Sequence, residues 1–295
     1  MSLAQSPAQA KLRERLLPVL VYIQARLDED LSLAVLAAEA SLSPHHFHRM
    51  FRGLVGETPE RYCQRLRLER AAFQLLVYRR ASILETALDC GFKNHETFTR
   101  AFGQHFGVSP REYRASEPRP SSQESKTQIS QLQASFELSQ TRVREIDDIP
   151  VAFIRHVGPY EQVGEVLWQR LVEFAGERGW TEQAPVTLLG VAHDAPGLTP
   201  PDRLRFDVAI RTPEPFSGTG EVGSQMIPGG IYGITTHVGH FSTLHNAYRT
   251  SVERLSELRR YRVVGLRSVE VYHSTSISEL YELNHTDICI PLELA

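Results

Sequence analysis

One stretch of the chain, Ser82 to Arg114, occurs a second time about fifty positions upstream, and this duplication limits what the first half can fold into. The downstream copy combines a short helix pattern, a glycine-centred turn, a second helix with a polar face and the start of a third helix. A unit of this length is too short to bury a core alone, so the two copies must share one scaffold. The sequence therefore predicts a helical domain built from two related units. The matching positions are Ser32 and Ser82, Ala37 and Ala87, Leu42 and Phe92, Arg49 and Arg100, Phe51 and Phe102, Gly56 and Gly107, Pro59 and Pro110, and Tyr62 and Tyr113.

Capping residues mark where the helices of this half begin. Three helix starts place a hydroxyl N-cap before a proline at the first helical position, where the missing N–H costs nothing. These starts are Ser43-Pro44, Thr58-Pro59 and Ser109-Pro110. Ser82 with Glu85 predicts a capping box. Apolar periodicity adds an opening helix over 11–27 and one unbroken helix over 58–78, which would join the two units.

The second helix of each unit leaves a polar face outward. Phe47 and Phe51 belong to the inward stripe of the first unit, and Phe98 and Phe102 to that of the second. Arginine can hydrogen-bond guanine bidentately, glutamate can accept from cytosine, and threonine can offer hydroxyl or methyl contacts. These faces suit base reading in a DNA groove, although solvated helix faces would show the same pattern. The candidate DNA contacts are His45, His48, Arg49, Arg52, Asn94, His95, Glu96, Thr99 and Arg100.

A rigid helix over 58–78 would fix the spacing between these two reading helices. Two such helices one turn of B-DNA apart could enter successive major grooves from a single chain, so a monomer is the preferred state. The nearby histidines, His45, His46 and His48, have no cysteine or further histidine at a matching spacing. We therefore expect no metal site.

Composition limits the function classes further. The chain has 295 residues, 41% of them hydrophobic, which suits two globular domains. Its net charge of −3 divides into +3 over residues 1–117 and −6 over the remainder, which permits DNA binding by the first part. No apolar run approaches a membrane span and the N-terminus lacks a signal-peptide core, so we expect a cytoplasmic protein with no membrane partner. Three cysteines without metal or redox spacing fit a reduced compartment.

The chain divides between these two parts at a stretch of low hydrophobicity. Residues 118–140 are rich in Ser, Gln and Pro, and they predict a flexible linker. The linker would separate a DNA-binding domain over 8–117 from a second domain over 141–295.

The second domain shows an internal repeat of its own. Period-two alternation predicts strands, interrupted by amphipathic helices over 162–176 and 242–258. The tripeptide at 156–158, His-Val-Gly, recurs eighty-one positions later at 237–239, and each copy precedes a helix. We therefore expect an α+β domain, a pseudo-symmetric tandem repeat of strand, helix and two strands, with a cleft between its halves.

The first half resembles the DNA-binding domain of AraC-family transcription regulators. The motifs that carry the resemblance are LSLAVLAAEASLSPHHFHRMF, GETPERYCQRLRLERA and GFKNHETFTRAFGQHFGVSPREYR. The resemblance implies seven helices with two helix-turn-helix units and double-stranded DNA as partner. It also implies transcription activation through RNA polymerase. The histidine-rich first reading helix departs from typical base-reading sets, so the resemblance does not predict the target sequence.

The second half resembles the GyrI-like small-molecule-binding domain, through RHVGPYEQVGEVL, THVGHFSTLHNAY and the strand VEVY. Such domains bind lipophilic, often cationic effectors, as in multidrug binding, in a cavity with aromatic walls and a buried glutamate. By position that glutamate is Glu270, which strand alternation places on one face with Tyr272. The second repeat has Gly-His-Phe where the first has Gly-Pro-Tyr, which leaves the pocket polarity open. The candidate ligand-binding residues are Glu270, Tyr160, Trp168, Tyr232, Phe241, Tyr248 and Tyr272.

Other interpretations of the second domain stay open at this point. From the residues alone, Glu270 is more simply an exposed strand glutamate, and the resemblance reverses that preference. We expect a regulator that is not an enzyme and carries no cofactor, since no triad order, phosphate loop or metal spacing is present. The alternatives are a small-electrophile hydrolase using Glu270 with a tyrosine, and a protein-interaction module without a ligand pocket.

Overall fold

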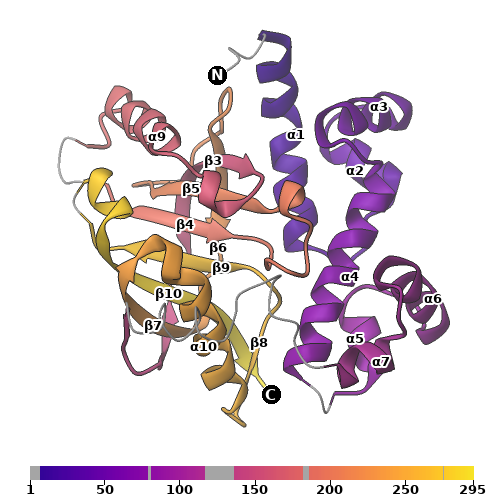
Figure 1. Ribbon diagram of the computed structural model, residues 1–295. Coiled ribbons are helices and arrows are strands. Elements are labelled where there is room, and N and C mark those ends of the chain that lie inside the picture. Colours follow the sequence, from indigo (N-terminus) through magenta and orange to yellow (C-terminus); the bar gives the residue numbers. More distant parts are fainter. Residues whose placement is uncertain (1–6, 79–80, 117–135, 182–185, 275) are drawn as a thin grey trace. The chain divides into compact units, whose positions relative to one another are not determined.

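The computed structural model in Figure 1 describes residues 7–78, 81–116, 136–181, 186–274 and 276–295. The chain forms two compact units, one helical and one built on a sheet. This division confirms the predicted pairing of an all-α part with an α+β part.

Seven α-helices make up the described part of the N-terminal unit, as the family resemblance implies. The expected joining helix is α4, which runs without a break and packs against α3, α5, α6 and α7. The opening helix α1 begins and ends slightly earlier than predicted and contains Pro18. The helices are α1 (Pro7–Ala25), α2 (Leu33–Glu39), α3 (Pro44–Val55), α4 (Pro59–Val77), α5 (Ile83–Asp89), α6 (His95–Phe106) and α7 (Pro110–Ala115).

The predicted caps form as hydrogen bonds. The side chain of Ser43 accepts from the N–H of His46, and that of Thr58 accepts from the N–H of Arg61. Two complete capping boxes occur, at the start of α5 with Glu85 and at the start of α7 with Glu112. α3 and α6 both end at a glycine in the left-handed region, which releases the chain from the helix.

The two repeated units also share an aromatic packing contact. Phe51 meets Tyr62 edge-on, with ring centroids 5.4 Å apart at 74°. Phe102 meets Tyr113 in the same way, at 5.3 Å and 79°. Each pair joins a reading helix to the helix that follows it, so the two units hold their reading helices by the same contact.

The two units differ at the turn before the reading helix. Gly91 has φ +77°, and a Cβ there would lie 2.4 Å from the Leu27 carbonyl oxygen. Ser41 occupies the equivalent position with φ 53°, a conformation that costs an L-residue about 1–2 kcal/mol. The Arg15 guanidinium holds this turn by donating to the Ser41 carbonyl oxygen at 2.9 Å.

Ser41→Gly is expected to stabilise the protein by about 0.5–1 kcal/mol, because glycine removes the left-handed strain and loses part of that gain to its chain entropy. Urea denaturation followed by circular dichroism measures the change. Ala38→Gly, at an exposed position of α2, is the matched control and is expected to destabilise by about 1 kcal/mol. Equal destabilisation by both glycines would contradict the strain at Ser41.

The C-terminal unit is an antiparallel sheet in the order β1-β7-β10-β9-β4-β5-β3-β6, with β2 also paired to β7 and β8 to β10. Its helices are α9 (Glu165–Glu177) and α10 (Leu244–Ser256). Short 3-10 helices are η1 (Tyr160–Gln162), η2 (Pro201–Arg203), η3 (Phe241–Thr243) and η4 (Ser278–Tyr281). The strands are β1 (Glu137–Leu138), β2 (Arg142–Ile146), β3 (Ile149–Val157), β4 (Leu188–Ala192), β5 (Arg205–Arg211), β6 (Gly223–Ile227), β7 (Gly230–His240), β8 (Tyr261–Val263), β9 (Ser268–Tyr272) and β10 (Leu283–Leu294).

The predicted tandem repeat is present in this sheet. One repeat is β3-α9-β4-β5 and the other is β7-α10-β9-β10, so the central order β7-β10-β9-β4-β5-β3 is the same read from either end. The two repeats join where β4 pairs with β9, and Gly190 lies opposite Glu270 in that pair. The imidazole of His156 lies close to Gly158, and that of His237 lies close to Gly239. The backbones differ, because Gly158 has φ +140° just after β3 and Gly239 lies within β7.

Some boundaries differ from the prediction. The sequences of β4, β6 and β8 were not singled out as strands, because LLGVA in β4 and the segments of β6 and β8 do not alternate clearly. Within the predicted linker 118–140, Glu137–Leu138 forms β1 and pairs with β7, while residues 118–135 lie outside the described part of the chain. Among the described helices, none is long and apolar enough to span a bilayer.

Candidate nucleic-acid and ligand sites

The outer face of α3 carries the first set of predicted contacts. His45, Arg49 and Arg52 are exposed and His48 is half-buried, while the Phe47 ring beneath them is fully buried. The four polar residues and Gly53 line one shallow hollow on this face. The sequence therefore placed these side chains correctly on the solvent side of the helix.

The outer face of α6 carries the second set. His95, Glu96 and Arg100 are exposed, and Thr99 is half-buried with its hydroxyl 3.5 Å from His95 Nε2. Asn94 has a different place: it is the N-cap of α6, and its Oδ1 accepts from the Thr97 N–H at 2.9 Å. The signal for this cap, an asparagine directly before the helix, was present in the sequence.

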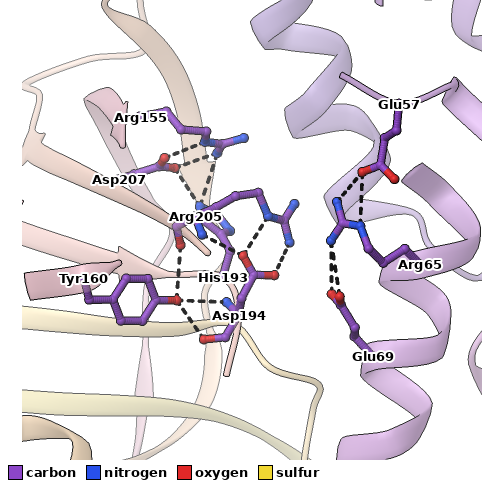
Figure 2. A network of polar contacts seen from close by, with 9 residues as sticks. All are labelled: Glu57, Arg65, Glu69, Arg155, Tyr160, His193, Asp194, Arg205 and Asp207. Atoms are coloured by element: carbon purple, nitrogen blue, oxygen red, sulfur yellow. Dashed lines mark hydrogen bonds and ion pairs between the residues drawn. The ribbon is translucent and has the colours of Figure 1, made fainter. Parts of the chain in front are cut away.

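A buried ion cluster fixes the start of the joining helix α4, as Figure 2 shows. Arg65 donates to Glu57 Oε1 through Nη2 at 2.6 Å and to Glu69 through Nη1 at 3.3 Å. Glu69 is fully buried and Glu57 lies in the turn between α3 and α4. The cluster therefore ties the end of the first reading unit to the helix that leads to the second.

Glu270 is the central polar group of the second unit. It lies on β9, is 4% exposed, and accepts hydrogen bonds on both carboxylate oxygens. Tyr248 of α10 donates to Oε1 at 2.9 Å, and Tyr272 donates to Oε2. Within the described part of the chain, no lysine or arginine forms an ion pair with this carboxylate.

Aromatic rings surround this glutamate on the face covered by both helices. The buried ring of Trp168, from α9, meets Tyr272 edge-on at 5.5 Å. Tyr160 packs against Phe206 at 5.6 Å and donates its hydroxyl to the Asp194 carbonyl oxygen at 2.7 Å. The structure therefore brings Trp168, Tyr248 and Tyr272 around Glu270, with Tyr160 behind Phe206.

Burial dominates the acid–base chemistry of this cluster. Desolvation raises the pKa of Glu270 above its ordinary value, and the hydrogen bonds from Tyr272 and Tyr248 oppose part of that rise. Desolvation followed by the charge on Glu270 raises the pKa of Tyr248 and of Tyr272 well above the usual phenol value. Both phenols are therefore neutral donors, and the carboxylate lacks any counter-charge supplied by the described residues.

Two family models match the chain. The GyrI-like small molecule binding domain matches residues 139–293, more than half of the chain, and a helix-turn-helix domain matches residues 36–116. The chain belongs to the GyrI-like family. Its helical part carries the matched helix-turn-helix domain.

Similar proteins cover only parts of this GyrI-like chain. LumQ of Photobacterium leiognathi, a probable transcriptional regulator, is 36% identical over 102 residues, 34% of this chain and 41% of LumQ. Right origin-binding protein of Escherichia coli K12 is 38% identical over 98 residues, 33% of this chain and 34% of that protein. A crystal structure of a regulator with an AraC-type domain from Chromobacterium violaceum is 31% identical and covers 36% of this chain and 94% of that one, with a TM-score of 0.33. The chain thus spans less than half the length of either named relative.

One predicted wall residue of the GyrI-like domain, Tyr232, lies on the other face of the sheet. Glu270 lies opposite Ile288 of β10, and Ile288 lies opposite Thr235 of β7. Tyr232 is three residues from Thr235, so strand alternation turns it to the opposite face of the sheet, and its hydroxyl donates to the Pro228 carbonyl oxygen. The prediction of Tyr232 as a wall was therefore wrong.

Phe241 packs against two rings. It meets Tyr281 edge-on, with ring centroids 5.4 Å apart, and its centroid lies 4.4 Å from that of His240. The Tyr281 hydroxyl donates to the Val163 carbonyl oxygen at 2.9 Å, and burial raises the pKa of Tyr281 to about 12. Tyr281 was not among the predicted residues, because it belongs to a short 3-10 helix without periodicity.

Gly190 is a site residue that sequence reasoning missed. A Cβ at this position would lie 2.5 Å from Phe206 Cζ, 2.8 Å from the Tyr272 hydroxyl and 3.1 Å from Glu270 Oε2. Glycine on the partner strand therefore lets the two rings close over the carboxylate. The glycine inside LLGVA was the available signal, since glycine in a strand marks a close approach.

A second buried carboxylate lies on the other face of the same sheet (Figure 2). Asp207 is opposite Val191, one residue on from Gly190, so it points away from the Glu270 face. Arg155 donates to its two oxygens at 2.6 and 2.7 Å, His193 Nε2 lies 2.7 Å away and Gln225 donates at 2.8 Å. Asp207 is fully buried.

The pKa values in this second network are set by burial and by the contacts of Asp207 with Arg155 and His193. Burial alone would raise the pKa of Asp207, but Arg155 and His193 together bring it well below its usual range. Burial lowers the pKa of His193 to about 4, against the opposing charge of Asp207. Beside the network, Arg205 forms a bidentate pair with Asp194 at 2.8 and 2.5 Å. Neither network was predicted, and the described residues contain no His, Cys, Asp and Glu cluster that could hold a metal ion.

Proposed function

We propose that this chain is a sequence-specific DNA-binding transcription regulator whose activity is controlled by a small lipophilic cation. The observation that carries the DNA part is the repeated unit: two equivalent helices, α3 and α6, each present an exposed polar face over a buried phenylalanine stripe. The names of LumQ and of Right origin-binding protein support a DNA-directed function.

The chemistry of the two faces favours unequal roles in base reading. α6 offers Glu96 and Arg100, an acceptor for cytosine and a bidentate donor for guanine. α3 offers Arg49 as the equivalent donor. Its two histidines, His45 and His48, discriminate less strongly between bases. We therefore infer that α6 supplies most of the sequence preference, while α3 adds contacts in the neighbouring groove. Asn94 then holds the start of α6 in place through its cap.

Arg100→Ala is expected to weaken binding to a specific duplex by about 1–3 kcal/mol and to lower the ratio of specific to non-specific affinity, because it removes a bidentate base contact. Arg49→Ala is expected to show a smaller loss of the same kind. Fluorescence anisotropy on duplexes that the intact protein has selected from a random pool measures both affinities.

Arg111→Ala is the matched control, since Arg111 is an exposed arginine outside α3 and α6. It is expected to leave the specificity ratio unchanged. A uniform loss on all duplexes for Arg100→Ala would assign this residue to the phosphate backbone. Unchanged affinity in both variants would overturn the proposed reading helices.

The effector part of the proposal rests on Glu270. A carboxylate that is buried, flanked by aromatic rings and without a cationic partner among the described residues is complementary to a ligand that brings its own positive charge. Aromatic walls then favour a lipophilic cation over a strongly hydrated one. Binding can control the DNA-bound state only if the ligand prefers one state of the protein over another.

We further propose that the protein acts in the cytoplasm as a monomeric activator that contacts RNA polymerase, in line with its AraC-type domain. Transcription in vitro from a selected site tests the sign: added protein should raise transcript yield, and a lowered yield would make it a repressor. A hydrolase function receives less support, because both Glu270 oxygens already accept tyrosine hydroxyls.

A further inference from the structure

The end of helix α9 folds back on itself and gathers aromatic rings at its tip. Arg178 is the C-cap, and Gly179 follows with φ +72°, in the left-handed region that glycine adopts without strain. The turn lets the Trp180 N–H donate to the Ala175 carbonyl oxygen at 3.0 Å. It returns the Trp180 ring to the side of Phe174, with ring centroids 5.8 Å apart at 77°.

A third ring closes this group from another part of the chain. Phe216, which follows β5, lies 6.0 Å from Phe174 and 5.2 Å from Trp180, centroid to centroid. The three centroids therefore form a nearly equilateral triangle. All three rings are half-buried, so each keeps part of its surface open to solvent. We call Phe174, Trp180 and Phe216 the aromatic cup.

One cation covers the aromatic cup. The guanidinium carbon of Arg178 lies 4.5 Å from the centroid of Phe174, 5.6 Å from that of Trp180 and 5.3 Å from that of Phe216. Arg178 is exposed, and its guanidinium makes no hydrogen bond or ion pair with the residues that the structure describes. The contact that the described residues give this guanidinium is thus attraction to the rings, an interaction that is weak at exposed positions.

We propose that the aromatic cup is a binding site for a small quaternary ammonium group, and that Arg178 occupies it in the absence of ligand. Three converging ring faces attract any cation that fits them, and the guanidinium shows that a cation of that size fits. Among the described residues, no carboxylate pairs with the cation in the cup, so a primary ammonium would lose hydrogen bonds to water without replacement. A quaternary ammonium has no N–H group and therefore loses no hydrogen bonds to water.

This site is distinct from the proposed effector site. It shares no residue with the Glu270 cluster, and it uses ring faces in place of a buried carboxylate. The chain has two tryptophans, and they divide between the sites: Trp168 packs beside Tyr272, whereas Trp180 belongs to the aromatic cup. The two sites can therefore be observed separately in one intact protein.

The test uses the full-length Trp168→Phe variant, in which Trp180 is the remaining tryptophan. Choline is titrated at constant ionic strength while Trp180 emission is recorded, and the neutral carbon analogue of choline is titrated in parallel. We expect a saturable change with choline and none with the analogue. Arg178→Ala in the same background is expected to tighten choline binding about three-fold, because the competing cation is gone.

Two further variants separate the explanations. Phe216→Leu keeps the apolar volume but removes one ring face, and it should weaken choline binding about three-fold or more. Glu270→Gln should leave the choline titration unchanged, so failure of the effector proposal does not decide this one. Calorimetric titration of the chain with both tryptophans present repeats the comparison if Trp168→Phe fails to fold.

Some outcomes would overturn the proposal. The absence of a saturable change with and without Arg178 would mean that the cup is only packing for the end of α9. An equal response to the neutral analogue would replace a cation site by an apolar one. A response that Glu270→Gln abolishes would assign the signal to the other site.

Discussion

Asp207→Asn is expected to destabilise the C-terminal unit by about 3–5 kcal/mol, the cost of leaving a buried charge without its partner. Asp207 is fully buried and pairs with Arg155, whose side chain is 7% exposed. The variant keeps the shape of the side chain but removes the charge that offsets the buried guanidinium. Urea denaturation at neutral pH, followed by circular dichroism, measures the loss.

Two controls distinguish this network from a general effect of losing an aspartate. Asp202→Asn changes an exposed residue of η2 and should alter stability by less than about 0.5 kcal/mol. Arg155→Met combined with Asp207→Leu removes both charges and should recover much of the loss, since apolar pairs can replace buried ion pairs. A small effect of Asp207→Asn alone would mean that water reaches this face of the sheet.

Glu270→Gln is expected to weaken binding of tetraphenylphosphonium, a lipophilic cation, by about 2–5 kcal/mol, because it removes the buried charge that the ligand would pair with. Glutamine keeps the volume and can still accept the hydrogen bond from Tyr248. Equilibrium dialysis or calorimetry on the intact protein measures the affinity. Glu257→Gln, an exposed residue just beyond α10, is the matched control and should bind as the unmodified chain does.

The pH dependence gives the Glu270 prediction a second signature. The pKa of Glu270 is raised in the folded protein, so its protonated form is favoured there and cannot pair with a cation. Affinity should therefore fall as pH decreases through that raised pKa, and it should be flat for Glu270→Gln. Folding stability changes with pH in the opposite direction to ligand affinity. The buried carboxylate destabilises the folded protein as pH rises, because it becomes charged. Without ligand, Glu270→Gln should therefore be more stable than the unmodified chain at neutral pH. Unchanged affinity in Glu270→Gln would contradict the effector site.

The N-terminal unit could be predicted almost completely, because its structure is encoded locally. A hydroxyl before a proline starts a helix wherever it occurs, and Gly56 and Gly107 end helices for the same local reason. The exposed faces of α3 and α6 then follow from the phenylalanine spacing. Asn94 was assigned to DNA although its position before a helix also marks a cap, so one local signal was overlooked.

The ligand cluster was predictable only in part, because it depends on strand register. Alternation along one strand placed Glu270 and Tyr272 on a common face, which needs no knowledge of the neighbours. Tyr232 failed because its face depends on how β7 is aligned with β10, and the sequence does not fix that alignment. Gly190 and Asp207 depend on β4, a strand whose apolar run has no clear period.

The unbroken course of α4 limits which mutations this protein can accept during evolution. Each residue added to a helix turns everything beyond it by about 100° and moves it by about 1.5 Å. One inserted or deleted residue in Pro59–Val77 would thus turn α6 out of phase with α3, even if both units still folded. Point substitutions in α4 can accumulate as long as its buried face is kept. Changes of length there would disrupt the proposed binding to two successive grooves in a single step. Under that proposal, the target sequence can change base by base while the distance between its two halves stays constant.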